Sequence, residues 1–85
     1  MNEIQLWICS YIENVDLEFN NLSQKMKLDC DIFEATNLDS LGVMNLLLGA
    51  EEKFVFSFSA ENFQDRRLRT VSGLASLIAE IVAAK

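Results

Sequence analysis

The chain has 85 residues, of which 51% are apolar, and it carries a net charge of −6. This composition excludes a disordered chain, and the length predicts one small domain, residues 1–85, that buries about 60% of its unfolded surface. No run of 18 apolar residues is present and the start, Met1 to Ile4, lacks the features of a secretory signal, so we expect a cytoplasmic protein without a membrane-spanning helix.

The charge is unevenly distributed along the chain. Residues 1–52 contain ten acidic residues against two lysines, whereas residues 53–85 contain five basic residues against three acidic ones. The acidic part disfavours nucleic acid as a partner, because its phosphates would be repelled. It favours proteins with basic docking surfaces, although simple solubility is an alternative reason for the charge.

The residue types limit the chemistry that the chain can perform. It has no histidine, and its only cysteines are Cys9 and Cys30. Ser-His and Cys-His nucleophile pairs are therefore excluded, and a zinc site lacks ligands. Carboxylates, lysines and Tyr11 remain as acid-base groups, and nothing in the sequence groups them into a pocket. We therefore expect neither an enzyme nor a metal site, and we expect the two thiols to stay free.

An amphipathic helix is predicted over residues 2–15, with Asn2 as its cap. The apolar residues that recur with the helical period are Ile4, Ile8, Tyr11, Ile12 and Val15. Residues 16–36 are expected to be mostly an ordered loop, because clusters of Asn and Asp favour turns while apolar residues between them pin the segment to the helices. A short helical turn near residues 21–25 is the alternative.

A second helix is predicted over about residues 41–54. Asn37 precedes it, and asparagine tolerates positive φ better than other non-glycine residues, which predicts a tight turn into the helix. Asp39 or Ser40 then caps the helix. Apolar residues lie on more than one of its faces, which is typical of a helix that is central to a core or covered by a partner.

The remaining chain predicts an extended connector and two further helices. Residues 55–58 alternate as a strand would, but no second strand is available to pair with them. A short helix follows Ser59, which is not expected to form a capping box with Asn62. After a basic turn at residues 65–69, Thr70 caps the last helix. The prediction is an all-α protein with three longer helices, one short helix and a long ordered loop.

The motif Leu38-Asp39-Ser40-Leu41 at the start of the second helix resembles that of the acyl and peptidyl carrier proteins. The Phe33 region, the segment Glu51-Glu52-Lys53-Phe54 and the segment Leu68-Arg69-Thr70-Val71 are also similar to this family. Asp-Ser-Leu alone is a weak signal, since any helix cap can look like it. Together with Glu-Glu-x-Phe eleven residues after the serine and Thr-Val thirty residues after it, the pattern is specific. The resemblance covers nearly the whole chain and implies a small four-helix bundle of acyl-carrier type.

The resemblance implies that Ser40 carries 4′-phosphopantetheine, installed from coenzyme A by a separate transferase that uses a magnesium ion. Asp39 and Leu41 are its motif neighbours, and Asp39 is expected to help the transferase recognise the site. The thiol of the arm would hold an acyl, aminoacyl or peptidyl group as a thioester. The chain would then be a monomeric carrier that serves acyl-loading, elongating and transferring enzymes, as in fatty-acid or polyketide biosynthesis.

Three departures from the family pattern point to a specialised carrier. Asn37 stands where glycine is frequent, Gly42 and Asn45 stand where acidic residues are usual, and residues 65–67 lengthen the connector before the last helix. Partners of a housekeeping fatty-acid carrier dock largely by charge. We therefore expect a more apolar docking face, in a specialised polyketide, fatty-acid-like or nonribosomal-peptide pathway.

Five residues of the second helix are candidates for partner contact: Val43, Met44, Leu48, Glu51 and Glu52. Core packing is the alternative for the three apolar residues, and a solvated helix end is the alternative for the two glutamates. For Ser40 the alternative is an ordinary helix cap. The chain would then be an unmodified helical interaction module that docks through the second helix.

Overall fold

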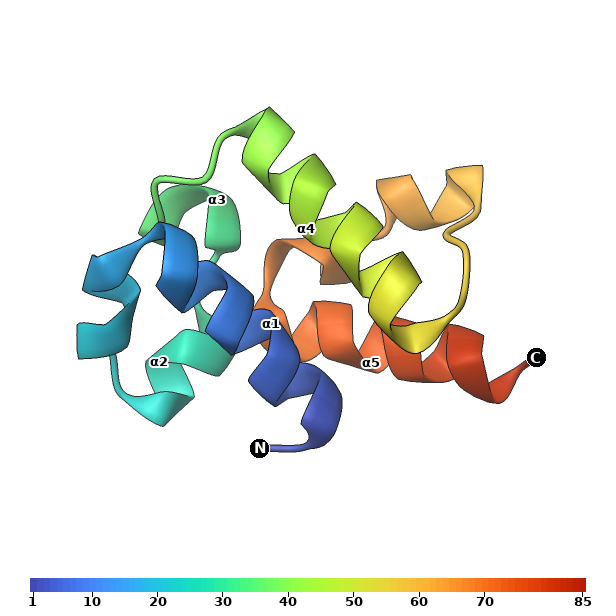
Figure 1. Cartoon of the computed structure of the whole chain (residues 1–85), viewed down its shortest axis with the longest axis horizontal. Coiled ribbons are helices and arrows are strands. Elements are labelled where there is room, and N and C mark those ends of the chain that lie inside the picture. Colours follow the sequence, from blue (N-terminus) through green and yellow to red (C-terminus); the bar gives the residue numbers. More distant parts are fainter.

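The computed structural model describes all 85 residues and confirms the all-α class (Figure 1). Five α-helices and three 3-10 helices follow one another along the chain: α1 (Glu3–Val15), η1 (Leu17–Asn21), α2 (Gln24–Asp29), α3 (Ile32–Ala35), α4 (Ser40–Phe54), η2 (Ala60–Gln64), η3 (Arg66–Arg69) and α5 (Val71–Ala83). The predicted connector after the second helix is present, but it begins with a turn at Val55, and residues 56–59 have no regular secondary structure. None of the helices has the length and apolar character that crossing a bilayer requires.

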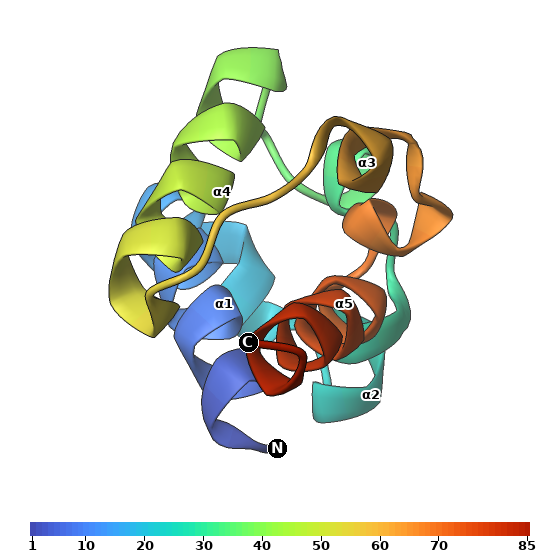
Figure 2. The ribbon, with the colours of Figure 1, turned by 90° about the vertical axis from the view of Figure 1, so that its right-hand side faces the viewer.

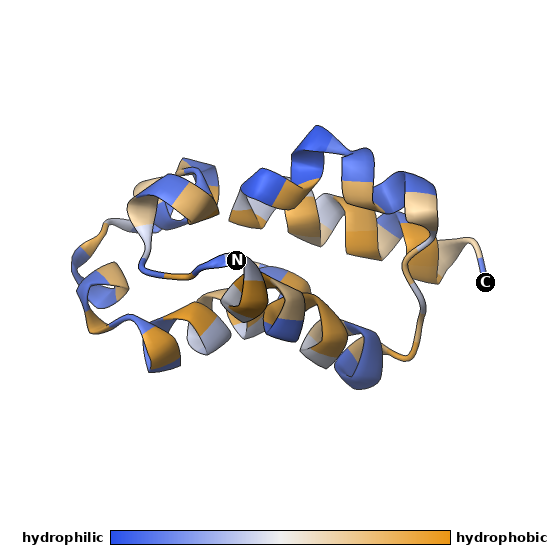
Figure 3. Ribbon diagram, turned by 90° about the horizontal axis from the view of Figure 1, so that it is seen from above, coloured by the Kyte–Doolittle hydropathy of each residue, from blue (hydrophilic) through white to orange (hydrophobic).

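The helices α1, α4 and α5 build the core. α1 contacts both α4 and α5, and α2 also contacts α5. Figure 2 looks roughly along α5 and shows the other helices arranged around it. Hydrophobic and hydrophilic residues alternate along the helices in Figure 3, as expected for helices with one buried side. The largest fully buried side chains include Phe19, Ile8, Ile12, Ile32, Leu46, Leu74 and Ile78.

The first helix begins and ends as predicted. The Asn2 side chain accepts a hydrogen bond from the Gln5 N–H at 2.8 Å, and the Gln5 side chain accepts one from the Asn2 N–H at 3.0 Å. This reciprocal pair satisfies two amides that have no partner within the helix. Ile8 and Ile12 are fully buried and Ile4 and Tyr11 pack partly against the core, which confirms these four residues of the apolar stripe, whereas Val15 is 53% exposed and does not belong to it.

The segment 16–36 differs from the prediction of a mostly ordered loop without helices. It forms η1, α2 and α3, each with its own capping side chain, from Asp16, Ser23 and Asp31 respectively. Phe19 and Ile32 anchor the segment in the core. Capping and two buried anchors therefore stabilise helical turns that are too short to stand alone.

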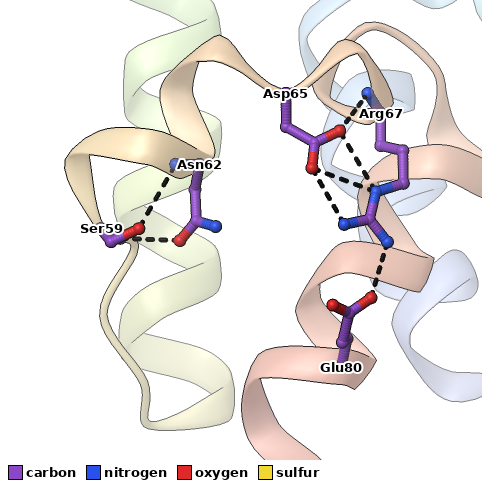
Figure 4. Close-up of polar contacts among 5 residues, drawn as sticks. All are labelled: Ser59, Asn62, Asp65, Arg67 and Glu80. Carbon is purple, nitrogen blue, oxygen red and sulfur yellow. Dashed lines mark hydrogen bonds and ion pairs between the residues drawn. The ribbon is translucent and has the colours of Figure 1, made fainter.

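A cluster of polar side chains fastens η3 to α5 (Figure 4). Arg67 donates to the Asp65 carboxylate at 2.9 Å and to the Glu80 carboxylate at 2.7 Å. The hydrogen bonds from Arg67 lower the pKa of Asp65. Nearby, Ser59 and Asn62 do complete a capping box, contrary to the prediction. The basic turn is thus partly neutralised by its own ion pairs.

Positive φ occurs at a residue that the sequence did not indicate. Val55, at the end of α4, has φ of 55°, and it is the only non-glycine residue with positive φ. Asn37 therefore does not adopt the predicted left-handed turn. The left-handed Val55 lets the Phe56 N–H reach the Glu51 carbonyl at 3.2 Å, and Phe56 returns to the core.

Replacing Val55 with glycine is expected to stabilise the protein. The left-handed conformation costs a side-chain-bearing residue about 1–2 kcal/mol, and Val55 is 70% exposed, so little burial is lost. After the entropy cost of glycine, we expect a gain of about 0.5–1 kcal/mol, measured as a higher midpoint of thermal unfolding. Leu17→Gly is the control, because Leu17 is exposed with ordinary φ, and it should lower the midpoint. An unchanged or lower midpoint for Val55→Gly would contradict the prediction.

Candidate functional site

Ser40 is the first residue of α4 and is exposed to solvent. Asp39 caps the helix, since its carboxylate accepts a hydrogen bond from the Gly42 N–H at 2.8 Å. The prediction left the cap open between these two residues, and the structure assigns it to Asp39. The Ser40 hydroxyl is therefore not used for capping, and it lies at a helix N-terminus, where the backbone amides and the helix dipole favour a bound anion.

The segment before Ser40 is held by side chains. The Thr36 hydroxyl donates to the Ile32 carbonyl at 2.6 Å and accepts from the Leu38 N–H at 3.2 Å. The Asn37 N–H donates to the Asp16 carboxylate at 2.9 Å. The two backbone amides before the capping residue are thus both satisfied, and the segment leads into α4 in a defined conformation.

Gly42 has a packing reason to lack a side chain. A Cβ at this position would lie 2.8 Å from Leu38 Cδ2 and 3.4 Å from a carboxylate oxygen of Asp39. Leu38 is half-buried against the core. An acidic residue at position 42 would therefore require the end of the flexible Leu38 side chain to move aside, whereas Asn45 is exposed.

The exposed side of α4 carries large apolar residues next to Ser40. Leu41 is 69% exposed, Met44 45% and Leu48 54%. Their spacing of three and four residues places them on one side of the helix. We call the residues Leu41, Met44 and Leu48 the apolar face of α4. Val43, by contrast, is buried at 7% exposure, so its prediction as a partner contact is wrong and it belongs to the core.

The two glutamates at the end of α4 have different surroundings. The Glu51 carboxylate accepts a hydrogen bond from the Phe58 N–H at 2.7 Å and thereby holds the connector against the helix. Glu52 is exposed and forms no ion pair. Glu51 is thus engaged within the protein, and Glu52 is the glutamate that a partner can reach.

Arg69 ties α3, shortly before the Ser40 segment, to the start of α5. Its guanidinium donates to the Asp31 carboxylate at 2.7 Å and lies 4.9 Å from the centre of the Phe33 ring. Burial raises the pKa of Asp31, but hydrogen bonds from Arg69 and from the Phe33 N–H outweigh it, so the pKa is lowered overall. The sequence placed Arg69 only in a basic turn, and its structural role was missed because its partner lies 38 residues away.

The surroundings of Ser40 form a surface site rather than a cleft. The two pockets of the structure, of about 260 and 380 Å³, lie between α1 and α2 and beside the C-terminal half of α5. Neither is lined by a residue of α4. No group of three or more Cys, Asp or Glu side chains is arranged to hold a metal ion. Cys9 and Cys30 are free thiols, and burial raises the pKa of both.

The geometry therefore defines a small helical bundle that presents a serine beside an apolar helix face. Comparisons of the chain with protein-family models, with curated proteins and with solved structures found no match.

Proposed function

We propose that the chain is an acyl carrier protein that bears 4′-phosphopantetheine on Ser40. The observation that carries the proposal is the separation of roles at the start of α4, where Asp39 caps the helix and leaves the exposed Ser40 hydroxyl without a structural task. The motif Leu38-Asp39-Ser40-Leu41 and its spacing to the similar segments further along the chain support the same proposal.

The surroundings of Ser40 fit the proposed group. A phosphodiester on the serine oxygen would lie at the N-terminus of α4, where the helix dipole is favourable for negative charge. Asp39 carries a like charge and is occupied as the cap, so its proposed role is recognition by the transferase. When bound, the group supplies a thiol that holds an acyl, aminoacyl or peptidyl cargo as a thioester.

The proposed partners are a phosphopantetheinyl transferase and the enzymes that load, elongate or transfer the cargo. They would meet the apolar face of α4, with Glu52 and Asp39 as exposed acids at its ends. The scarcity of acids on this face supports a dedicated cytoplasmic carrier in a specialised polyketide, fatty-acid-like or nonribosomal-peptide pathway. The apolar face also supports a second candidate, an unmodified interaction module that docks through α4.

Incubation with coenzyme A, magnesium and a broad-specificity phosphopantetheinyl transferase is expected to add one phosphopantetheine group. The reason is that Ser40 is the exposed serine with its hydroxyl free at the start of a helix. Intact-mass measurement detects the addition, and Ser40→Ala is expected to abolish it.

Ser76→Ala is the matched control, because Ser76 is an exposed helical serine on α5 and its loss should leave the modification unchanged. An absence of modification under conditions that modify a known carrier would refute the proposal and favour the interaction module. Modification at another serine would refute the assignment to Ser40.

A further inference from the structure

Asp16 is the only charged or polar residue that is buried, with 5% exposure. It forms no ion pair that would compensate its charge. Instead, its two carboxylate oxygens accept from two backbone amides, one from the Glu18 N–H at 3.1 Å and the other from the Asn37 N–H at 2.9 Å. A buried carboxylate without a cation is costly, so these two bonds are what makes its burial tolerable.

The two hydrogen bonds of Asp16 differ in how far away along the chain their partners lie. The bond to Glu18 is an ordinary cap of η1, of the kind that Asp31 makes for α3 and Asp39 makes for α4. Those caps are not buried, so capping alone does not require burial. The bond to Asn37 spans 21 residues and ends three residues before Ser40. This second bond is what distinguishes Asp16 from the other caps.

The Asp16–Asn37 bond also stands alone. Between Asn37 and Asp39, the Leu38 N–H is bonded to the neighbouring Thr36 hydroxyl, and the Asp39 side chain is bonded within α4. No other hydrogen bond connects this three-residue segment to α1 or η1. Leu38 adds apolar packing, which restrains the segment without fixing its direction.

We propose that Asp16 is a positioning residue for Ser40. Its carboxylate holds the Asn37 amide against the end of α1 and the start of η1. It thereby sets the position of the first turn of α4, which begins at Ser40. Asp16 does not touch the group that Ser40 carries. The inference rests on the proposed function in one respect, which is that Ser40 is the modified residue.

The test compares Asp16→Ala and Asp16→Asn with the wild-type chain. Alanine removes both acceptors, whereas asparagine keeps one acceptor oxygen and replaces the other with an NH₂ group that cannot accept. Ser23→Ala is the matched control, because Ser23 caps α2 through the Met26 N–H and has no bond to the Ser40 segment. Ser23→Ala and Asp16→Ala therefore both lose a cap, whereas only the Asp16 variants can lose the link to Asn37.

The first measurement is amide hydrogen exchange, which does not depend on modification. We expect the Asn37 amide to exchange at least about tenfold faster in Asp16→Ala, relative to the core amides of α5, and to an intermediate degree in Asp16→Asn. In Ser23→Ala the ratio of Asn37 to core exchange should remain that of the wild type. If Asn37 exchange changes only in proportion to the core in both Asp16 variants, the proposal is overturned.

The second measurement is the kinetics of Ser40 modification with coenzyme A and a phosphopantetheinyl transferase. Since the apolar face of α4 is intact in the variants, we expect kcat to fall about tenfold in Asp16→Ala while KM for the carrier stays unchanged. A wild-type kcat in a folded Asp16 variant overturns the positioning role. If Asp16→Ala does not fold, Asp16→Asn decides both measurements. If the wild-type chain is not modified, the proposed function fails, and the exchange measurement still decides whether Asp16 orders the segment.

Discussion

Replacing Gly73 with alanine is expected to lower the free energy of unfolding by about 2 kcal/mol, although alanine is the better helix former. A Cβ at Gly73 would lie 2.6 Å from the Arg67 carbonyl oxygen and 2.8 Å from the Thr70 hydroxyl oxygen. The Arg67 carbonyl is backbone, so it can yield only if η3 moves away from α5. Because the closest atom is backbone, the overpacking cost is taken at the upper end of about 1–3 kcal/mol, which leaves about 2 kcal/mol after the helix-propensity gain of about 1 kcal/mol is subtracted.

Thermal unfolding of the Gly73→Ala variant measures this effect, and for a domain of this size we expect the midpoint to fall by roughly 10 °C. Ser76→Ala on the same helix is the control. Ser76 is exposed, so alanine there should change the midpoint only slightly and upward. A midpoint for Gly73→Ala at or above that of the wild type would show that η3 does not pack this closely on α5.

The long helices could be predicted from the sequence because their signals are local. The apolar periodicity of α1 and α5 extends over 13 residues each, and the caps Asn2 and Thr70 stand directly before them. α2 and α3 have only six and four residues, so no periodicity can develop within them. Their existence depends on the caps Ser23 and Asp31 and, for α3, on the burial of Ile32 against distant parts of the chain.

α4 shows where periodicity stops being informative. Apolar residues occupy most of its circumference, so the sequence could not decide which of them face the core. Val43 and Met44 were both expected to contact a partner. Met44 is exposed, but Val43 is buried. Likewise, Val55 takes the left-handed conformation against its own preference, since the chain must turn there for Phe56 to return to the core.

The residues of the candidate site also fall into two groups, those that a local motif identifies and those that act through distant partners. Asp39, Ser40 and Leu41 are adjacent in sequence, so a motif can identify them. Asp16 and Arg69 shape the same region through partners 21 and 38 residues away, and no local pattern marks them. An aspartate between two apolar residues, Val15 and Leu17, was the one available signal of a buried carboxylate, and it is too common to be specific.

Replacing Leu48 with glutamate is expected to weaken docking of the proposed carrier to its proposed partner enzymes by about thirtyfold without unfolding it. Leu48 is 54% exposed and lies between Met44 and the exposed Glu52, inside the surface that the proposed partners would cover. Residues at the centre of an interface can contribute about 2 kcal/mol, which corresponds to roughly thirtyfold in affinity. The measurements are kcat/KM for Ser40 modification by the transferase and the thermal midpoint, which should stay near the wild-type value.

Two controls separate apolar docking from docking by charge. Leu17→Glu places the same new charge on an exposed leucine of η1, outside the apolar face, and should leave kcat/KM unchanged. Asn45→Glu restores an acid on the exposed side of α4 without the clash with Leu38 that an acid at Gly42 would cause. If docking is apolar, this acid brings no gain with the chain's own partner enzymes. A higher kcat/KM for Asn45→Glu would mean that charge governs the interface. An unchanged kcat/KM for Leu48→Glu would mean the same, since a buried apolar contact cannot accept a glutamate without loss.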